Sequence, residues 1–342
     1  MPSLSTGAML SSAKKLGDRL RSPEFLTFAS EKSGIDYDRL RQLVSQYTAE
    51  VASGLNVLAG AELAGKRILE VGAGIGVLSI ALAQDGHNIT ALEPGANGFD
   101  VNARVGAAVR EWLAAEDLRM LDIEVDRLEP ARHGEFDLIF SVNVLEHIPD
   151  LSAAISAMES VLAPNGMMIH LCPNYTVPYE PHFGIPLVPL APRLTGGFVR
   201  GIERHPAWPS INFITYAEVQ RLAKRFELSV TFRRGLMYDA FVRLDTDQEF
   251  GARHTGVVQR IYSLLKATRI LGLLRHVPPA LATPMIFECR HVQEISRVLP
   301  RETDANPRRS RESGSHIREG ARAWDRRRIS RQASLADRFA DA

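Results

Sequence analysis

The apolar positions of the chain follow two alternating periods along most of its length. Short apolar runs of strand length recur between residues 67 and 290, separated by stretches with the helical period of 3.6 residues. This alternation predicts an α/β fold built on a parallel, doubly wound sheet. The expected strands are Arg67–Val71, Asn88–Glu93, Leu118–Glu124, Phe136–Val142, Met167–Cys172, Leu228–Arg234 and Met285–Arg290.

Three of the intervening helices have recognisable ends. Val77–Gln84 directly follows a glycine-rich loop. Leu151–Leu162 has one apolar face, with Asp150 as its expected N-cap and the sequence Pro-Asn-Gly as its stop. Thr215 begins a capping box and is expected to open another helix that runs to about Phe226.

The loop after the first strand indicates a nucleotide site. Residues 67–77 read RILEVGAGIGV. A dinucleotide fingerprint needs a glycine where the chain has Val77, which disfavours a nicotinamide oxidoreductase, and no Gly-Lys-Ser/Thr of a Walker loop follows. Glu93 lies 21 residues after Gly72, where an acid can accept hydrogen bonds from both hydroxyls of a ribose. The pattern therefore predicts a ribose-binding site without a pyrophosphate.

Four segments resemble the class I S-adenosylmethionine-dependent methyltransferases: LEVGAGIG, ITALEPG, FDLIFSVNVLEHIPD and VLAPNGMMIHLCPN. The resemblance covers about residues 60–172 and continues more weakly to residue 290. It implies an enzyme with a Rossmann-like, seven-stranded sheet whose last strand is antiparallel. It also implies S-adenosylmethionine as the cofactor. The closing pair LSVTFRRG and PMIFECRH fits that ending.

The resemblance implies a set of cofactor-binding residues: Glu70, Gly72, Gly74, Gly76, Glu93, Glu124 and Asn143. The three glycines would let the backbone meet the methionine part of the cofactor. Glu70 would orient the loop or bind the ammonium group through water. Glu93 would bind the ribose hydroxyls.

The remaining two residues have open alternatives. Glu124 is expected near the adenine amine, where Asp122 and Asp126 are rivals on the same stretch. Asn143 is expected at the end of the fourth strand, beside the carboxylate and the sulfonium of the cofactor. A buried structural hydrogen bond is an equal alternative for Asn143.

Methylation of an oxygen requires a group that removes its proton. Residues 173–214, rich in Pro and aromatic residues, are a long insertion after the fifth strand, and we call them the lid segment. We predict His182 of the lid segment as the base, kept neutral by apolar neighbours. Glu180 would orient its ring or serve as the base itself. His147 is the second candidate, with a packing role as its alternative.

The sequence divides into five parts: 1–60, an N-terminal helical segment; 61–172, the cofactor-binding core; 173–214, the lid segment; 215–298, the end of the core with an amphipathic helical insertion; and 299–342, a disordered Arg-rich tail. The tail from residue 300 has eleven arginines against seven acids. Residues 256–277 are expected to form one cationic amphipathic helix, and no acid occurs from 251 to 287. This helix either caps the active site or lies on an anionic membrane surface.

Composition narrows the function further. The net charge is +1, and neither of the two cysteines has a CxxC partner, so we expect no metal site and no nucleic-acid partner. No signal peptide or membrane span is recognisable, which predicts a cytoplasmic protein with at most peripheral contact with the inner membrane face. The expected activity is O-methylation of a small molecule such as a sugar or lipid-linked glycan precursor. Alternatives are a quinone or secondary-metabolite methyltransferase and a non-catalytic binding protein of this fold. No pattern indicates the oligomeric state.

Overall fold

The structure is a computed structural model that describes residues 6–95, 100–115, 117–205, 207–246, 251 and 256–292. The chain forms two units, Met1–Ser296 and Arg297–Ala342, and every described residue belongs to the first. The tail predicted from residue 299 lies outside the described residues.

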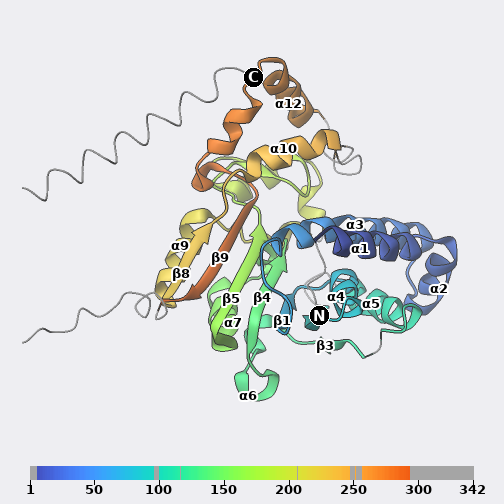
Figure 1. The fold of residues 1–342 in the computed structure, drawn as a ribbon. Helices are drawn as coiled ribbons and strands as arrows, with labels where there is room; N and C mark the ends of the chain where they lie inside the picture. The colour runs from blue at the N-terminus through green and yellow to red at the C-terminus, as the bar shows by residue number, and fades with distance from the viewer. Residues whose placement is uncertain are drawn as a thin grey trace, which may run out of the picture. The chain divides into compact units, whose positions relative to one another are not determined.

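A seven-stranded sheet forms the centre of the fold (Figure 1). Its strands are β1 (Arg67–Val71), β2 (Asn88–Leu92), β3 (Arg119–Leu121), β4 (Phe136–Val142), β5 (Leu162–Cys172), β8 (Leu228–Phe232) and β9 (Met285–His291). Their order is β3-β2-β1-β4-β5-β9-β8. Strand β9 runs antiparallel to β5 and to β8, whereas the pairs from β3 to β5 are parallel. The predicted fold class is therefore confirmed.

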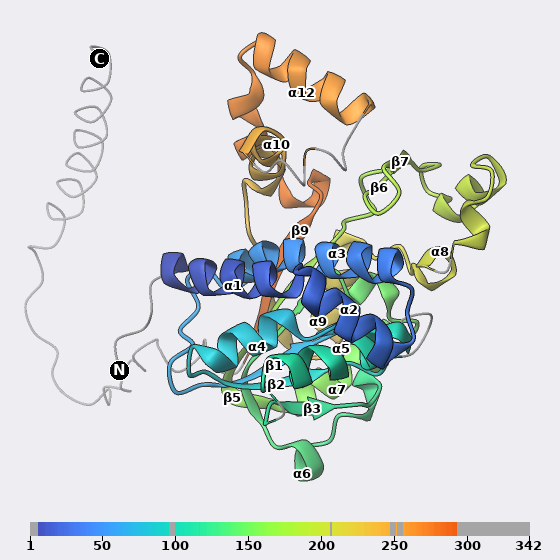
Figure 2. The same ribbon diagram turned by 90° about the vertical axis from the view of Figure 1, so that its right-hand side faces the viewer.

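Helices cover both faces of the sheet because neighbouring residues of a strand point to opposite sides. Ile68 of β1 belongs to a core shared with α1 (Thr6–Leu20), α2 (Pro23–Ser33), α3 (Tyr37–Val57), α4 (Val77–Gln84) and α5 (Asp100–Trp112). Leu69 belongs to the opposite core, with α7 (Leu151–Ser160) and α9 (Tyr216–Arg225). Figure 2 views the first layer from its outer side. The short helices are η1 (Val125–Arg127), α6 (Pro130–His133) and η2 (Leu145–His147).

Both predicted N-caps are present. The side chain of Asp150 accepts a hydrogen bond from Ala153 N at 2.9 Å, and that of Thr215 accepts one from Glu218 N at 3.2 Å. Such caps satisfy amide groups that the first turn of a helix leaves without a partner.

The predicted stop of α7 is wrong. The helix ends at Ser160, and Pro164-Asn165-Gly166 lies inside β5 instead. The pairing of β4 with β5 shifts register between Phe136 and Leu138, which leaves the Pro-Asn-Gly residues in an irregular stretch. A proline has no amide hydrogen to donate, so a bulge is a place where a strand tolerates it.

Two insertions rise at the end of the sheet to which β1, β4 and β5 point (Figures 1 and 2). The lid segment contains β6 (Tyr179–Glu180), β7 (Ile185–Pro186), η3 (Pro192–Gly197), η4 (Ile202–Arg204) and α8 (Ala207–Ser210). The second insertion contains α10 (Leu236–Thr246), α12 (Val257–Ala267), η5 (Leu271–His276) and η6 (Pro279–Leu281).

The continuous helix predicted over residues 256–277 is also wrong. Helix α12 ends at Ala267, and Arg269 has a φ of 57°, in the left-handed region that ends helices. The chain resumes as η5, so the apolar residues of this segment face more than one direction. Among the described residues, no helix combines the length and apolarity needed to cross a bilayer.

Candidate active site

The loop between β1 and α4 requires glycine at two positions. Gly72 has a φ of 74° and Gly74 a φ of 56°, a region that other residues adopt only with strain. A Cβ at Gly72 would lie 2.3 Å from the Cγ2 atom of Val144, and one at Gly74 would lie 2.1 Å from the Cε1 atom of Tyr47. The loop thus packs tightly between helix α3 and the loop after β4.

Tyr47 was not predicted as part of the site. It lies on α3 between the buried residues Val44 and Val51 and packs against the core, so its position on the apolar face was the available signal. Burial, followed by the charges of Glu93 and Glu50, raises the pKa of its hydroxyl. Helix α3 therefore covers the glycine loop with a neutral phenol.

Replacing Gly74 with alanine is expected to destabilise the fold more than the same change at Gly65. Both residues have positive φ angles, of 56° and 70°, so each alanine should cost about 1–2 kcal/mol in backbone strain. Only the new methyl at position 74 meets a neighbour within 4 Å, which adds about 1–3 kcal/mol. Urea unfolding of both variants measures the difference, and equal midpoints would show that Tyr47 does not close on the loop.

Glu93 fastens the glycine loop to the end of β2. Its Oε2 atom accepts a hydrogen bond from Gly74 N at 2.8 Å, whereas Oε1 has longer contacts with Gly95 N at 3.3 Å and with Asn102 Nδ2 at 3.5 Å. Burial raises the pKa of the carboxyl, and these hydrogen bonds oppose that shift. The more weakly bonded Oε1 retains capacity to accept from a ligand.

Glu70 is buried at the end of β1, not solvated as a free acid at a strand end would be. Ser79 Oγ donates to its Oε2 atom, and both groups lie under the glycine loop. Burial raises the pKa of Glu70 to about 7, against the opposing effect of this hydrogen bond. Glu70 thus anchors the start of α4 to the strand before it.

The two residues with open alternatives both line the cavity of the site. Glu124 does so from the start of η1, whereas its rivals Asp122 and Asp126 do not. Asn143 follows β4 with a φ of 53°, and its backbone N–H donates to Leu171 O at 2.8 Å. The backbone bond holds the turn, and the residue lines the cavity.

One cavity of about 1440 Å³ extends along this edge of the sheet. Gly72 and Glu93 line one part, and His147 and His182 line another. The cavity has far more apolar than polar lining, much of it from the second insertion. Most of the predicted cofactor residues therefore share one cavity with His147 and His182, whereas Gly74, Gly76 and Glu180 do not line it.

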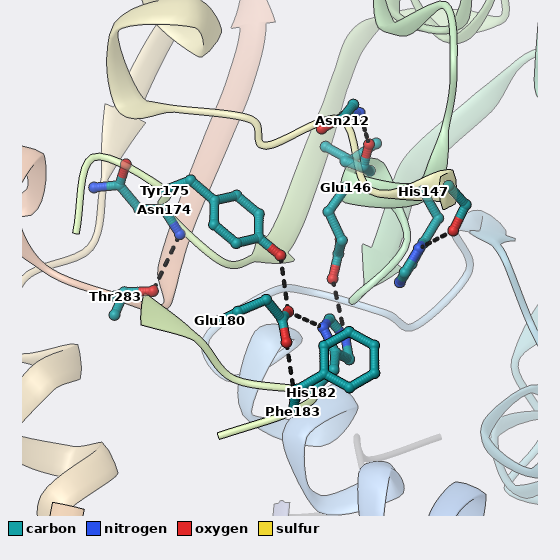
Figure 3. Close-up of polar contacts among 11 residues, drawn as sticks. Glu146, His147, Asn174, Tyr175, Glu180, His182, Phe183, Asn212 and Thr283 are labelled. Carbon is teal, nitrogen blue, oxygen red and sulfur yellow. Dashed lines mark hydrogen bonds and ion pairs between the residues drawn. The ribbon is translucent and has the colours of Figure 1, made fainter. Parts of the chain in front are cut away.

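His182 lies between two carboxylates (Figure 3). Its Nδ1 atom is 2.6 Å from Glu180 Oε1, and its Nε2 atom is 3.7 Å from Glu146 Oε1. Glu180 also accepts hydrogen bonds from the Tyr175 hydroxyl at 3.1 Å and from Phe183 N at 2.8 Å. Glu180 thus holds the ring in one orientation, which is one of the two roles expected for it.

The prediction that His182 is neutral is wrong. Burial alone would lower its pKa, but the hydrogen bond to Glu180 and the charge of Glu146 outweigh burial and raise the pKa to about 9. Burial opposes ionisation of Glu180, yet its bond to His182 brings its pKa below the usual value. The sequence showed the apolar neighbours of His182 but not the second acid facing it.

His147 is in the opposite electrostatic state. Its Nδ1 atom is 2.8 Å from Ser210 Oγ, and its ring lies 5.3 Å from that of His182. Burial, and next the charge of His182, lower the pKa of His147 to about 4. The two candidate bases are thus neighbours with pKa values far apart.

Glu146 is a site residue that was not predicted. It is fully buried, and neither carboxylate oxygen has a hydrogen-bond partner among the described residues. Burial raises its pKa to about 7, against the opposing charge of His182. The available signal was its place beside His147 after the fourth strand. Asn212 of the lid segment holds this loop, because its backbone N–H donates to Glu146 O at 2.7 Å.

The same cluster has the spacing of a cation site. Glu146, His147 and His182 each offer one ligand atom, and these atoms lie within 4.8 Å of one another. Two histidines and a carboxylate can bind divalent metals. No metal was predicted from the sequence, and chelation therefore tests whether this cluster binds one.

The chain is similar in sequence to known methyltransferases. A family model described as a methyltransferase domain matches residues 43–231, which is more than half of the chain. An uncharacterised protein of Mycobacterium tuberculosis (strain ATCC 25618 / H37Rv) is 37% identical over 227 residues, covering 64% of this chain and 76% of that protein. A ubiquinone biosynthesis O-methyltransferase of Psychrobacter arcticus is 35% identical over 108 residues, covering 31% of this chain and 40% of that enzyme.

Solved structures of methyltransferases are similar at lower identity. The magnesium protoporphyrin IX methyltransferase of Synechocystis, with bound S-adenosylhomocysteine, has a TM-score of 0.41 at 19% identity, covering 59% of this chain and 81% of that one. A methyltransferase of Mesorhizobium loti has a TM-score of 0.44 at 14% identity, covering 69% and 96%. With the family match and the glycine loop together, this chain belongs to the S-adenosylmethionine-dependent methyltransferase family.

Proposed function

We propose that this methyltransferase transfers a methyl group to a hydroxyl oxygen of a small amphiphilic molecule. The observation that carries the proposal is the single cavity that joins Gly72 and Glu93 to His182. A methyl donor and a proton acceptor must meet at one substrate atom, away from bulk water.

The described residues fit the cofactor. S-adenosylmethionine supplies a methyl group that is already electrophilic on its sulfonium. Glu93 would accept a hydrogen bond from a ribose hydroxyl at its weakly engaged Oε1 atom, and Glu124 would face the adenine. Gly72 would let the chain approach the methionine part, with Glu70 holding the loop from below and Asn143 bordering it.

His182 would accept the substrate proton at Nε2. In the neutral ring, Nδ1–H donates a hydrogen bond to Glu180, so the ring's own proton stays on Nδ1 and the lone pair of Nε2 is left to accept the substrate proton. The imidazolium that forms would face Glu146 Oε1 at 3.7 Å, so a buried negative charge stabilises it. Glu146 acts through His182 and does not itself line the cavity, which makes it a positioning residue.

The kcat/KM of the wild-type enzyme is expected to rise about tenfold per pH unit up to about pH 9 and then level off. Only unprotonated His182 can accept the proton, and its pKa is about 9. In Glu146→Gln one negative charge near the ring is lost, so the pKa of His182 falls and the rising limb moves to lower pH. Rates that are flat above about pH 5 would instead identify His147, whose pKa is about 4.

Chelation tests whether Glu146, His147 and His182 bind a metal ion instead. The Nε2 lone pair of His182 cannot both accept a proton and bind a metal. Activity that survives dialysis against EDTA supports proton transfer at His182. Activity that is lost and returns with a divalent metal would place a cation among the three side chains and contradict the proposed base.

The apolar lining favours an acceptor with an apolar part over a free sugar. A lipid-linked glycan precursor meets that condition, as does a quinol. The partial similarity to ubiquinone biosynthesis O-methyltransferases supports the quinol as the second candidate. A cytoplasmic location belongs to the same proposal.

Metabolite profiling tests the substrate class. A strain that lacks this gene should accumulate a lipid-phase species lighter than its product by one methylene unit. Purified enzyme should convert that species in the presence of S-adenosylmethionine. Accumulation of an unmethylated water-soluble or protein species would contradict the amphiphilic acceptor. No accumulation and no S-adenosylmethionine binding would favour the non-catalytic alternative.

A further inference from the structure

The large apolar side chains that the described residues leave exposed gather on the two insertions. The lid segment exposes Leu190, Leu194 and Phe198, of which Phe198 is 81% exposed. The remaining exposed positions outside the insertions are Leu10, Tyr37 and Val292 alone among these residues. Exposed apolar clusters of this kind are uncommon on monomers unless the surface binds something.

The second insertion presents the larger apolar set. Ile261 and Leu264 of α12 are exposed, and so are Ile270, Leu273 and Leu281 in the turns that follow. Val258, Leu265 and Leu274 of the same segment line the cavity, and so does the partly exposed Ile261. The insertion therefore supplies apolar side chains both to the cavity and to the solvent-exposed surface beside it.

Both insertions project at the same end of the molecule (Figures 1 and 2). Phe183 and Gly184 of the lid segment line the cavity, as Val258 and Leu265 of the second insertion do. The two insertions therefore border the cavity in common. An apolar molecule that enters between them would pass their exposed tips.

The charge of the second insertion indicates which kind of partner its exposed apolar surface binds. Residues 251–287 contain no acid, and Arg260, Arg269 and Arg275 are exposed there. The exposed Lys266 forms an ion pair with Asp245 of α10, so among the described residues the three arginines supply the uncompensated charge. A symmetric dimer through this face would place these basic segments against each other, which disfavours a second copy of the chain. Exposed leucine and isoleucine beside arginine and lysine is the composition of helices that lie in the headgroup region of anionic bilayers.

We propose that the tips of the two insertions dock onto an anionic phospholipid bilayer, with Leu264 and Leu273 of one tip and Phe198 of the other entering the interface. The docked protein presents the mouth of its cavity to the membrane. The docking itself is independent of the proposed reaction. We also propose that the methyl acceptor enters the cavity from the bilayer, and this part rests on the proposed reaction.

Co-sedimentation of the full chain with vesicles tests the docking. Vesicles of phosphatidylcholine alone are compared with vesicles that contain about one third phosphatidylglycerol, at about 0.05 M and about 0.5 M salt. The wild-type chain is expected to bind the anionic vesicles more tightly, and less so at high salt. The variants Leu264→Glu/Leu273→Glu and Phe198→Glu should each reduce partitioning by about tenfold or more. The matched control, Leu10→Glu on α1, should partition as the wild type does.

Three results would overturn the docking surface. The first is no binding at either composition, and the second is equal binding by the tip variants and the wild type, which would place the contact elsewhere, as on the basic tail. The third is a dimer in sedimentation velocity that the Leu264→Glu/Leu273→Glu change dissociates. The variant His182→Ala should still bind vesicles, so failure of the proposed reaction is distinguishable from failure of the docking.

Discussion

Replacing His182 with alanine is expected to lower kcat by about 10²–10⁴-fold while leaving the affinity for S-adenosylmethionine nearly unchanged. The variant loses the side chain that would accept the substrate proton in the shared cavity, and no proposed cofactor contact involves it. Turnover is measured as release of S-adenosylhomocysteine with the acceptor identified by profiling, and affinity is measured by calorimetry.

Two further variants make this result interpretable. His182→Gln can still donate toward Glu180 but cannot accept a proton at neutral pH, so it should lose turnover as alanine does. His276→Ala removes an exposed histidine of η5 that does not line the cavity and should retain wild-type turnover. Near-full activity of His182→Ala, together with loss in His147→Ala, would move the base to the loop after β4.

Replacing Glu93 with alanine is expected to weaken S-adenosylmethionine binding by about 10- to 150-fold. Hydrogen bonds from a ribose to a charged carboxylate contribute about 1.5–3 kcal/mol. The structure adds a second consequence, because Glu93 Oε2 also accepts from Gly74 N at 2.8 Å. The variant should therefore lose some stability as well as affinity, and calorimetry is paired with a thermal unfolding curve.

A second variant separates the two roles of Glu93, which are its negative charge and its hydrogen bond to the glycine loop. Glu93→Gln keeps an oxygen acceptor for Gly74 N but has no charge, so it should retain more stability than alanine and still lose affinity. Glu129→Ala, at an exposed acid outside the cavity, should bind as the wild type does. Unchanged affinity in both Glu93 variants would remove this residue from the cofactor site.

The order and type of the sheet elements were predictable because both faces of a parallel sheet are buried, so each strand appears in the sequence as a short continuous apolar run. Strands β1 and β4 have the predicted bounds. Glycine and the N-caps marked the helix starts through local chemistry, which a short stretch of sequence contains in full. The same local signals misplaced the end of α7, because Pro-Asn-Gly is equally compatible with the bulged strand that tertiary pairing selects.

The candidate site was predictable where one segment supplies the chemistry and not where several segments meet. The glycine loop and Glu93 could be identified from spacing along the chain. The pKa of His182 is raised first by Glu180, two positions earlier, and then by Glu146, which lies 36 positions earlier and reaches the ring only after the lid segment folds back. Tyr47 likewise meets Gly74 from a helix that precedes the sheet. Such contacts set pKa values and packing, and no local pattern encodes them.

Transfer of an isotopically labelled methyl group is the most direct test of O-methylation assisted by His182. The wild-type enzyme and His182→Ala are incubated with S-adenosylmethionine carrying a ¹³C methyl group and with a lipid extract of the deletion strain. We expect a ¹³C methoxy signal on a lipid-phase product of the wild type, with that signal strongly reduced for His182→Ala at equal cofactor occupancy. Label on nitrogen or carbon, or equal labelling by both proteins, would contradict O-methylation assisted by His182.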